Sequence, residues 1–307
     1  MLRGFMNTIN KKEFQILSLL AAEKGPLSQR QLSLRSGLSL GSVNKVVRGL
    51  LERQLMGEEG IRPQGLGALE PYRVRRAVFI AAGFGSRLAP VTLDIPKPLI
   101  PVKGERMIDG LLDAVLAAGI REIVIVRGYK AEAFDVLLEK YPMIRFVDNP
   151  DYAEANNILS ALCVRDLLEN AYIFDADLIL QKPALICPYH YESNFLGIYA
   201  KRTDDWCFTT RGGYILEERR GGTDCYQVIG ISYWSREDGR KLAGDLQEVA
   251  SMPGGREYYW EQVPMAVLRD RYRVAIRPCL AEDVIEIDTF NELKALDPSY
   301  ENYGGHA

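Results

Sequence analysis

Hydrophobic and polar positions follow two different rhythms along the chain. Within residues 10–56 the apolar residues recur every three or four positions, a spacing typical of amphipathic helices. Three helices are predicted there: residues 10–24, a short helix after Ser28, and residues 40–56. From residue 76 onward, short apolar runs of strand length alternate with helical patterns, which indicates β-α-β units.

The first part of the chain has the order of a helix-turn-helix. Its third predicted helix leaves Lys45 and Arg48 on a polar side that could face DNA. The glycine-punctuated segment 57–69 could form a wing hairpin, and the whole order resembles the winged-helix domain of MarR-like regulators. A proline then disfavours helix continuation, which predicts a winged helix-turn-helix domain at 1–72 and a second domain at 73–307. A module that docks proteins or the neighbouring domain is the alternative to a DNA-binding one.

The remaining chain predicts an α/β fold with a doubly wound, mixed sheet. Ligands of such sheets bind beyond the carboxyl ends of the strands. Between Asp177 and Asp288 the clean alternation of strands and helices is lost, which predicts a mixed insertion over the substrate side. The expected strands are 77–80, 122–126, 145–148, 171–174, 195–200, 209–217 and 228–233, and the expected helices are 107–118, 130–141 and 158–168.

A glycine-rich loop follows the first of these strands, in the segment 81–97. Gly83 and Gly85 have no Cβ, so the backbone can turn sharply and bring its amides against an anionic group. Arg87 and Lys97 add two cations, one suited to forked contact with phosphate oxygens and one a mobile point charge. The loop lacks the Gly-Lys-Ser/Thr ending of a P-loop and does not fit the dinucleotide fingerprint. It therefore predicts a triphosphate site of another type.

Two carboxylates follow the strand that ends near residue 174. Alternation puts Asp175 and Asp177 on the same side of an extended segment, where they could bind magnesium. The alternative is a pair of solvated loop acids, which is less expected after a strand that is apolar on both faces. The chain has only two histidines, and its five cysteines form no Cys-x-x-Cys pair. Metal sites built from imidazole or thiolate are therefore disfavoured, and a hard cation held by carboxylates is favoured.

Aromatic residues gather between positions 206 and 260, and all three tryptophans lie in this stretch. For any one of them a place in the core is the simpler interpretation. For the group as a whole, an aromatic cage around a quaternary ammonium is the sharper hypothesis, because ring faces attract cations. The expected substrate-binding residues are Trp206, Tyr233, Tyr259, Trp260 and Glu261.

The glycine-rich segment resembles the signature of sugar-phosphate and choline-phosphate nucleotidyltransferases. The match runs through Gly83, Gly85, Ser86, Arg87, Leu88, Pro90, Thr92, Pro96, Lys97 and Pro98. Further strings narrow the resemblance, over residues 76–297, to the bacterial CTP:phosphocholine cytidylyltransferases. These strings are 151–157, 174–177, 230–234, 259–261 and 286–288.

The resemblance implies a Rossmann-like nucleotidyltransferase fold. It also implies an enzyme that forms CDP-choline from CTP and phosphocholine and releases pyrophosphate. It implies that Asp177 and Asp288 hold Mg²⁺, that Gly83 to Arg87 cradle the β- and γ-phosphates, and that Lys97 acts near the α-phosphate. Catalytic roles are thus expected for Lys97, Arg87, Asp177 and Asp288. The expected nucleotide-binding residues are Ala81, Ala82, Gly83, Gly85, Ser86, Arg87, Gly128, Tyr129, Asn156 and Asn157.

Two other functions stay open at this point. One is a nucleotidyltransferase for a sugar-1-phosphate or an aminoalkylphosphonate, and the other is a DNA-binding regulator whose transferase domain only senses nucleotide. The aromatic stretch favours phosphocholine over a sugar, whose hydroxyls need more polar partners. The acids together with Lys97 argue against a purely sensing domain.

The charge is unevenly distributed along the chain, and the composition predicts where in the cell the protein is found. Residues 1–75 carry a balance of +6 and the remainder carries −9, which suggests different partners for the two parts, DNA being one for the first. The cysteines are expected to be free thiols, and no apolar run reaches the length of a signal peptide or membrane helix. A cytoplasmic protein without membrane contact is therefore expected, and a homo-oligomer is left open.

Overall fold

The computed structural model describes residues 8–23 and 25–304. The chain forms two compact units: one contains the residues up to Arg73 together with Tyr189–Tyr191, and the other contains Val74–Pro188 and the residues from Glu192 onward. Within the described residues, no helix combines the length and the apolar character that a membrane crossing requires.

The small unit contains the three predicted helices, α1 (Lys11–Ala22), α2 (Gln29–Ser36) and α3 (Leu40–Glu52). Each begins at a side chain that accepts hydrogen bonds from the first-turn amides, because the open amides of a helix start need such partners. Both long helices end earlier than their apolar pattern predicted. These residues cap α1, α2 and α3 in turn: Asn10, Ser28 and Ser39.

The wing of the small unit is shorter than predicted. The strands β1 (Met56–Gly57) and β2 (Gly60–Ile61) form a minimal antiparallel hairpin. The chain then enters the helix α4 (Pro63–Leu69), with proline at its first turn, where a missing amide costs nothing. Gly65 allows α4 to lie against the hairpin, because a Cβ there would lie 2.1 Å from the carbonyl oxygen of Leu55. The second half of the predicted hairpin is therefore a helix.

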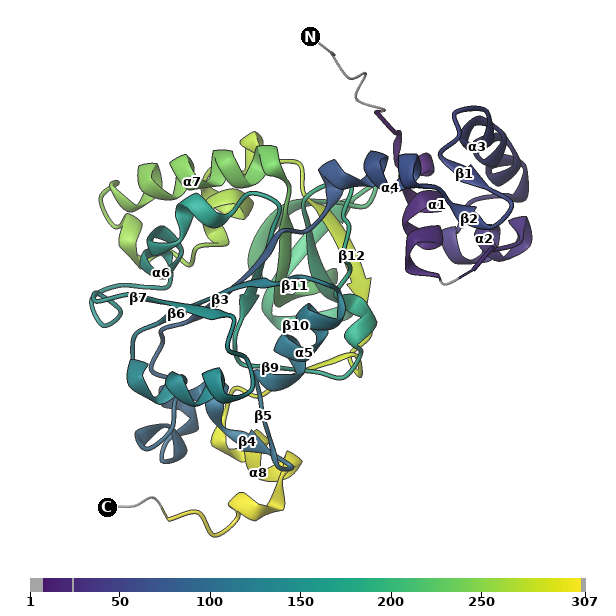
Figure 1. The fold of residues 1–307 in the computed structure, drawn as a ribbon. Coiled ribbons are helices and arrows are strands. Elements are labelled where there is room, and N and C mark those ends of the chain that lie inside the picture. Colours follow the sequence, from purple (N-terminus) through teal and green to yellow (C-terminus); the bar gives the residue numbers. More distant parts are fainter. Residues whose placement is uncertain (1–7, 24, 305–307) are drawn as a thin grey trace. The chain divides into compact units, whose positions relative to one another are not determined.

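The large unit is built on a seven-stranded mixed sheet (Figure 1). Its centre is parallel: β3 pairs in parallel with both β6 and β8, and β6 pairs in parallel with β7. Beyond β8 the sheet becomes mixed, since β11 runs antiparallel to β8 and β12 runs parallel to β10. Across the sheet, the strands are β10 (Asn194–Arg211), β12 (Ala275–Cys279), β11 (Tyr214–Trp234), β8 (Ala171–Asp175), β3 (Arg76–Ala81), β6 (Glu122–Arg127) and β7 (Ile144–Asp148).

Both faces of the sheet are covered, as a doubly wound fold requires. Along β3, Ala77, Phe79 and Ala81 pack on the face that α5 (Asp109–Ala117) and the 3-10 segment Ala131–Glu139 cover. The alternate residues Val78 and Ile80 pack on the other face, with α6 (Ile158–Cys163) and α7 (Arg236–Ala250). A central strand buried on both faces explains the continuous apolar run in the sequence.

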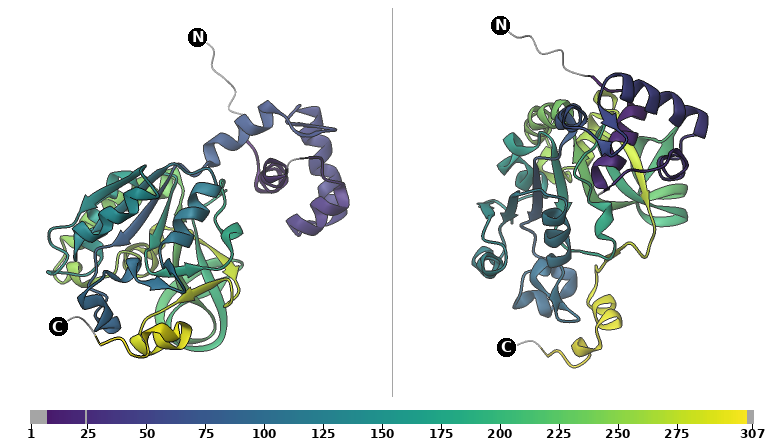
Figure 2. Two further views of the ribbon diagram at one scale, coloured as in Figure 1. Left: turned by 60° about the horizontal axis from the view of Figure 1, so that its bottom comes forward. Right: turned by 45° about the vertical axis from the view of Figure 1, so that its right-hand side comes forward.

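The insertion over the substrate side is one long hairpin of β10 and β11 in place of three separate strands (Figure 2). Register shifts interrupt this hairpin, among them one between Thr203 and Trp206. Such bulges break the alternation of side chains, so the sequence pattern looks like short separate strands. The helix α7 was not predicted, and the predicted helix 158–168 changes to 3-10 geometry after residue 163.

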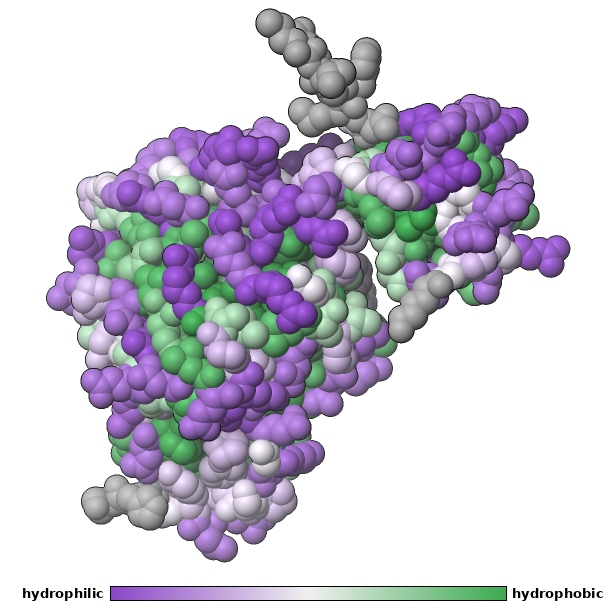
Figure 3. Space-filling model, viewed as in Figure 1, coloured by the Kyte–Doolittle hydropathy of each residue, from purple (hydrophilic) through white to green (hydrophobic). Residues whose placement is uncertain are grey.

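Among the described residues of the large unit, two short antiparallel pairs lie outside the main sheet. The strands β4 (Pro101–Val102) and β5 (Glu105–Arg106) form one pair, and β9 (Leu178–Leu180) and β13 (Val284–Glu286) form the other. The second pair brings a late segment, followed by α8 (Phe290–Leu296), beside the end of β8. On the face shown in Figure 3, hydrophobic residues gather over the middle of the large unit and hydrophilic residues surround them.

Candidate active site

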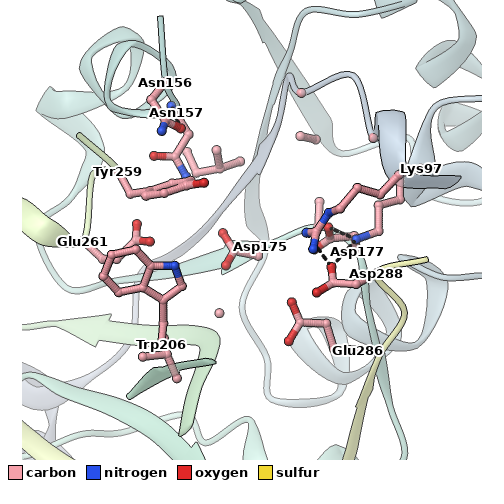
Figure 4. A pocket seen from close by; sticks show the side chains of 18 of the residues that line it. Lys97, Asn156, Asn157, Asp175, Asp177, Trp206, Tyr259, Glu261, Glu286 and Asp288 are labelled. Carbon is pink, nitrogen blue, oxygen red and sulfur yellow. Dashed lines mark hydrogen bonds and ion pairs between the residues drawn. The ribbon is translucent and has the colours of Figure 1, made fainter. Parts of the chain in front are cut away.

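A cavity of about 620 Å³ opens at the carboxyl ends of β3 and β8. Its walls come from the glycine-rich loop, the segment after β8, the β10–β11 hairpin, the segment 259–261 and the end of β13. Figure 4 shows two groups of side chains with Asp175 between them. Lys97, Asp177, Asp288 and Glu286 form one group, and Asn156, Asn157, Tyr259, Glu261 and Trp206 form the other.

The glycine-rich loop is shaped by two tight constraints. Gly85 has a positive φ of 63°, and a Cβ there would lie 2.9 Å from Cβ of Lys97. Glycine is therefore required both by the backbone and by the close approach of the lysine. Gly83, by contrast, would place a Cβ in open space. Both residues line the cavity with Ser86, so this backbone faces the space where an anionic group can lie.

Lys97 lies at the centre of the ionic cluster. Its Nζ is 2.7 Å from Oδ2 of Asp177 and 3.3 Å from Oδ1 of Asp288. Arg87 reaches the same Asp288 oxygen at 2.8 Å. Burial alone would lower the pKa of Lys97, but the carboxylates of Asp177 and Asp288 outweigh it and hold the pKa above its usual value. The lysine is therefore a fixed positive charge inside the cavity.

The two aspartates offer a suitable donor set for a divalent cation. Both carboxylates pair with the same lysine nitrogen, so they face one positive centre in the cavity. Within the described residues no group of three or more His, Cys, Asp or Glu side chains has metal-binding geometry. Magnesium commonly takes one or two carboxylates and completes its shell with water and substrate phosphates. Asp177 and Asp288 fit this pattern.

The opposite wall combines aromatic rings with acids. The rings of Trp206 and Tyr259 meet edge to face, with centroids 6.2 Å apart. Beside them, Glu218 and Glu261 each have a buried Oε2 atom without a hydrogen-bond partner. Burial raises the pKa of Glu218 to about 7, and burial together with the charge of Glu218 raises the pKa of Glu261 to about 8. This end of the cavity therefore favours a ligand that brings positive charge.

Asp175 lies between the two ends. Burial and the nearby charges of Glu261 and Asp177 raise its pKa well above the usual value. It approaches β11 so closely that a Cβ at Gly230 would lie 2.0 Å from its Oδ2 atom. The glycine on β11 therefore makes room for this carboxylate.

Most of the residues predicted from the sequence meet in this one cavity. Asn156 and Asn157 also fix the segment that carries Tyr259, because Nδ2 of Asn156 donates to the carbonyl of Glu257 and Oδ1 of Asn157 accepts from the amide of Trp260. The predicted residues that line the cavity are Ala81, Gly83, Gly85, Ser86, Arg87, Lys97, Asn156, Asn157, Asp177, Trp206, Tyr259, Glu261 and Asp288.

Two of the expected cage residues belong to the core. Tyr233 is 1% exposed, and its hydroxyl donates to Oδ1 of Asn170 at 3.1 Å. Trp260 is 3% exposed and stacks on Phe195 with ring centroids 6.0 Å apart. Neither lines the cavity. In the segment 259–261, Tyr259 and Glu261 line the cavity, whereas Trp260 between them packs into the core.

Three expected nucleotide-binding residues support the loop from behind. The carbonyl of Ala82 accepts a hydrogen bond from the amide of Tyr129, whose hydroxyl donates to the carbonyl of Thr92 at 2.9 Å. Gly128 lies against Tyr152, where a Cβ would come within 2.6 Å of the ring carbon Cγ. None of the three lines the cavity.

Other lining residues were not predicted. Asp205, Glu218 and Arg220 come from the β10–β11 hairpin, and Glu286 comes from β13. On β11 the alternation of side chains points Glu218 and Arg220 to the same face. The sequence contains this alternation, but only the register of the hairpin shows which face meets the cavity.

The mixed sheet and the cavity at its carboxyl edge define a nucleotidyltransferase, and comparisons with known proteins agree. The nucleotidyl transferase family model matches residues 76–185, and the winged helix-turn-helix DNA-binding model matches residues 9–54. A 2-aminoethylphosphonate cytidylyltransferase of Lancefieldella rimae is 35% identical over 228 residues, which cover 73% of this chain and 92% of that protein. The chain therefore belongs to the cytidylyltransferases of the nucleotidyl transferase family.

Further relatives support the same family. A choline-phosphate cytidylyltransferase of Streptococcus pneumoniae is 27% identical over 229 residues, which cover 74% of this chain and 99% of that protein. A solved structure of CTP:phosphocholine cytidylyltransferase from Streptococcus pneumoniae matches with a TM-score of 0.67 and 26% identity, covering 74% of this chain and 99% of that one. The resemblance and the fold class predicted from the sequence are thus confirmed, including the winged helix-turn-helix at the start.

Proposed function

We propose that this cytidylyltransferase transfers CMP from CTP to a small phosphoryl or phosphonyl compound that carries a positively charged nitrogen. The observation that carries the proposal is the division of one cavity into two ends. Lys97, Arg87 and the glycine-rich backbone suit phosphates at one end. Trp206 and Tyr259, with the acids Glu218 and Glu261, suit a cation at the other end.

In the proposed reaction, an oxygen of the acceptor's phosphate or phosphonate attacks the α-phosphorus of CTP. The bond to the β-phosphate breaks, and pyrophosphate leaves with the electron pair. The attacking oxygen is already anionic at neutral pH, so positioning and charge neutralisation can supply the catalysis without a protein nucleophile. Asp177 and Asp288 would hold Mg²⁺, which would neutralise charge on the phosphate oxygens.

Within the proposal, Gly83, Gly85 and Ser86 direct backbone amides at the triphosphate. Lys97 supplies fixed positive charge where the negative charge develops. The Arg87 side chain is 67% exposed, and among the described residues its ion pair is with Asp288 alone, so it can turn toward phosphate oxygens when CTP arrives.

Both acceptors considered from the sequence meet this description. Phosphocholine was the expected one, and an aminoalkylphosphonate was an alternative; each has a phosphorus group and a cationic nitrogen separated by a short chain. The relatives named for choline phosphate and for 2-aminoethylphosphonate support this common chemistry. A sugar phosphate fits less well, because it carries no positive charge to set against Glu218 and Glu261.

A pyrophosphate-release screen tests the proposal. It pairs CTP, UTP, dTTP and ATP with phosphocholine, phosphoethanolamine, 2-aminoethylphosphonate and glucose-1-phosphate, in the presence of Mg²⁺. Turnover should require CTP together with one of the three cationic acceptors. Preference for glucose-1-phosphate, or no turnover with any cationic acceptor, would refute the proposal.

We also propose that the small unit binds DNA. The winged helix-turn-helix model matches this region, and α3 exposes Asn44, Lys45 and Arg48 on its polar side. A gel shift with the DNA upstream of the protein's own gene should give a complex that weakens as salt rises. Arg48→Gln should weaken this complex, whereas Lys12→Gln on the exposed side of α1 should not. Absence of a salt-sensitive complex at low ionic strength would contradict DNA binding.

A further inference from the structure

Glu218 occupies a special place in the cavity wall. It lies on β11 opposite Phe208 of β10, and Arg220, two residues on, lies opposite Trp206. Glu218, Arg220 and Trp206 all line the cavity, so this face of the hairpin forms part of the end that is proposed to bind the cation of the acceptor. The neighbouring Glu217 points away and pairs with Arg269 at 3.5 Å.

The hydrogen bonding of Glu218 is incomplete. Its Oε2 atom is buried and has no partner, and the same holds for Oε2 of Glu261 across the cavity wall. A buried carboxylate oxygen is costly to leave without a donor, so such atoms normally have one. Two of them facing one cavity indicate that the missing donors come from a ligand.

The charges around Glu218 point to the same kind of ligand. Glu261, Asp175 and Asp205 contribute further carboxyl groups from three other segments, and Arg220 supplies positive charge in the same wall. Burial raises the pKa of Glu218 to about 7. A cation that donates hydrogen bonds would favour the ionised form and satisfy the buried oxygen at once.

We infer that Glu218 is a specificity-determining residue that selects an acceptor whose nitrogen carries N–H groups over one with a trimethylammonium group. This inference rests on the proposed function and identifies the class of cation that binds at the acidic end of the cavity. A primary ammonium offers three donors, enough for the unpartnered oxygens of both Glu218 and Glu261. A trimethylammonium group can interact with the aromatic rings and with negative charge, but it has no N–H to donate to these oxygens. The preferred substrate is therefore an aminoalkyl phosphonate or phosphate with a free amine.

A methylation series tests the inference on the unmodified protein. The acceptor skeleton, phosphonate or phosphate, is the one with higher activity in the screen, and its amine carries zero, one, two or three methyl groups. The kcat/KM should fall with each N–H removed, by at least about a hundredfold across the series, because the site would be left with unpaired buried oxygens. A trimethylated acceptor that is used as well as the free amine would overturn the inference while leaving the proposed function intact.

Variants then assign the effect to one residue. Glu218→Gln should reduce the preference for the free amine over the trimethylated acceptor by at least about tenfold, with the KM for CTP little changed. Glu218→Asp, which keeps the charge, should recover part of the preference. Glu217→Gln, the matched change on the outer face of the same strand, should leave it unaltered. An unchanged preference in a folded Glu218→Gln protein would overturn the assignment, and no turnover with any cationic acceptor would overturn the proposed function and this inference with it.

Discussion

At the scale of single residues, the acids of the cavity divide by their partners. Asp177 and Asp288 pair with Lys97, whereas Glu218 and Glu261 keep a buried oxygen without a partner. The pair beside Lys97 is the one that could hold a metal ion, whereas burial raises the pKa of Glu218 and Glu261 and makes them harder to ionise until a cation arrives. Similar side chains can thus serve opposite ends of one substrate pair.

We expect Asp177→Asn and Asp288→Asn each to lower kcat by a factor on the order of 10² or more, with the melting temperature little changed. Each change removes a charge that holds the cation without altering the size of the side chain. The double variant should lose much less than the product of the two, because one site is removed only once. Steady-state kinetics at saturating Mg²⁺ measure this.

The control for these variants is Asp270→Asn, at a side chain that is 97% exposed and lies outside the cavity. It should behave as the parent does. A near-normal rate in either site variant would remove that aspartate from the proposed metal site.

Acceptor binding should improve as pH rises through about 7 to 8. Burial raises the pKa of Glu218 to about 7 and that of Glu261 to about 8, so both are largely protonated below this range and ionised above it. A cationic acceptor needs the ionised forms, so its KM should fall with rising pH while its amine remains protonated. The acceptor's phosphorus group titrates nearby, so the difference between the parent and Glu218→Gln isolates the carboxylate. Parallel pH profiles for the two proteins would contradict this expectation.

The parts of the site that could be predicted from the sequence are those whose functional residues lie close together along the chain. The glycine loop and the acids after β8 lie in single segments, so their spacing was informative. The register of β10 against β11 selects Glu218 and Arg220, and no local pattern contains that register. The aromatic residues show the same limit, because burial separates Tyr259 in the cavity from Trp260 in the core.

At the scale of elements, close packing limits what the sequence pattern can show. The centre of the sheet was predictable because β3, β6 and β8 are apolar on both faces. The helix α7 was not predicted, although the Ser235 side chain caps its start. Its Gly239 is buried, and a Cβ there would lie 2.1 Å from the carbonyl oxygen of Leu168. One of the two glycines that weaken the helical pattern of α7 is thus the residue that lets the helix approach its neighbour.

Two glycines of α7 should respond to alanine in opposite ways. Gly239→Ala should lower the free energy of unfolding by about 1 to 3 kcal/mol, since the new Cβ must push α7 away from a backbone carbonyl. Gly244→Ala should raise it by about 0.5 to 1 kcal/mol, because that position is exposed, has nothing within 4 Å of the new Cβ, and alanine favours the helix. Urea unfolding of the full chain measures both. Equal effects from the two changes would contradict the close approach at Gly239.

At the scale of the whole molecule, the small unit is not made from one continuous segment. Tyr191 stacks on Tyr72 with ring centroids 5.3 Å apart and also meets Phe14 at 5.5 Å. Tyr189 is buried in the same core. A segment far along the chain therefore completes the packing of a unit that a simple cut near residue 72 would treat as finished.

Removal of residues 1–72 should leave an active transferase with a solubility defect. The relatives from Lancefieldella and Streptococcus are matched over at least 92% of their length by about three quarters of this chain, so the remaining region corresponds to nearly complete enzymes. Truncation removes the partners of Tyr189 and Tyr191, however, and exposed aromatic surface promotes association. The shortened protein should keep a kcat close to the parent value but aggregate at lower concentration.

Replacing both tyrosines by serine should restore solubility to the shortened protein without changing its kcat. Light scattering and pyrophosphate release measure the two properties, and a shortened protein that is inactive with the serine pair in place would show that the small unit is needed for catalysis.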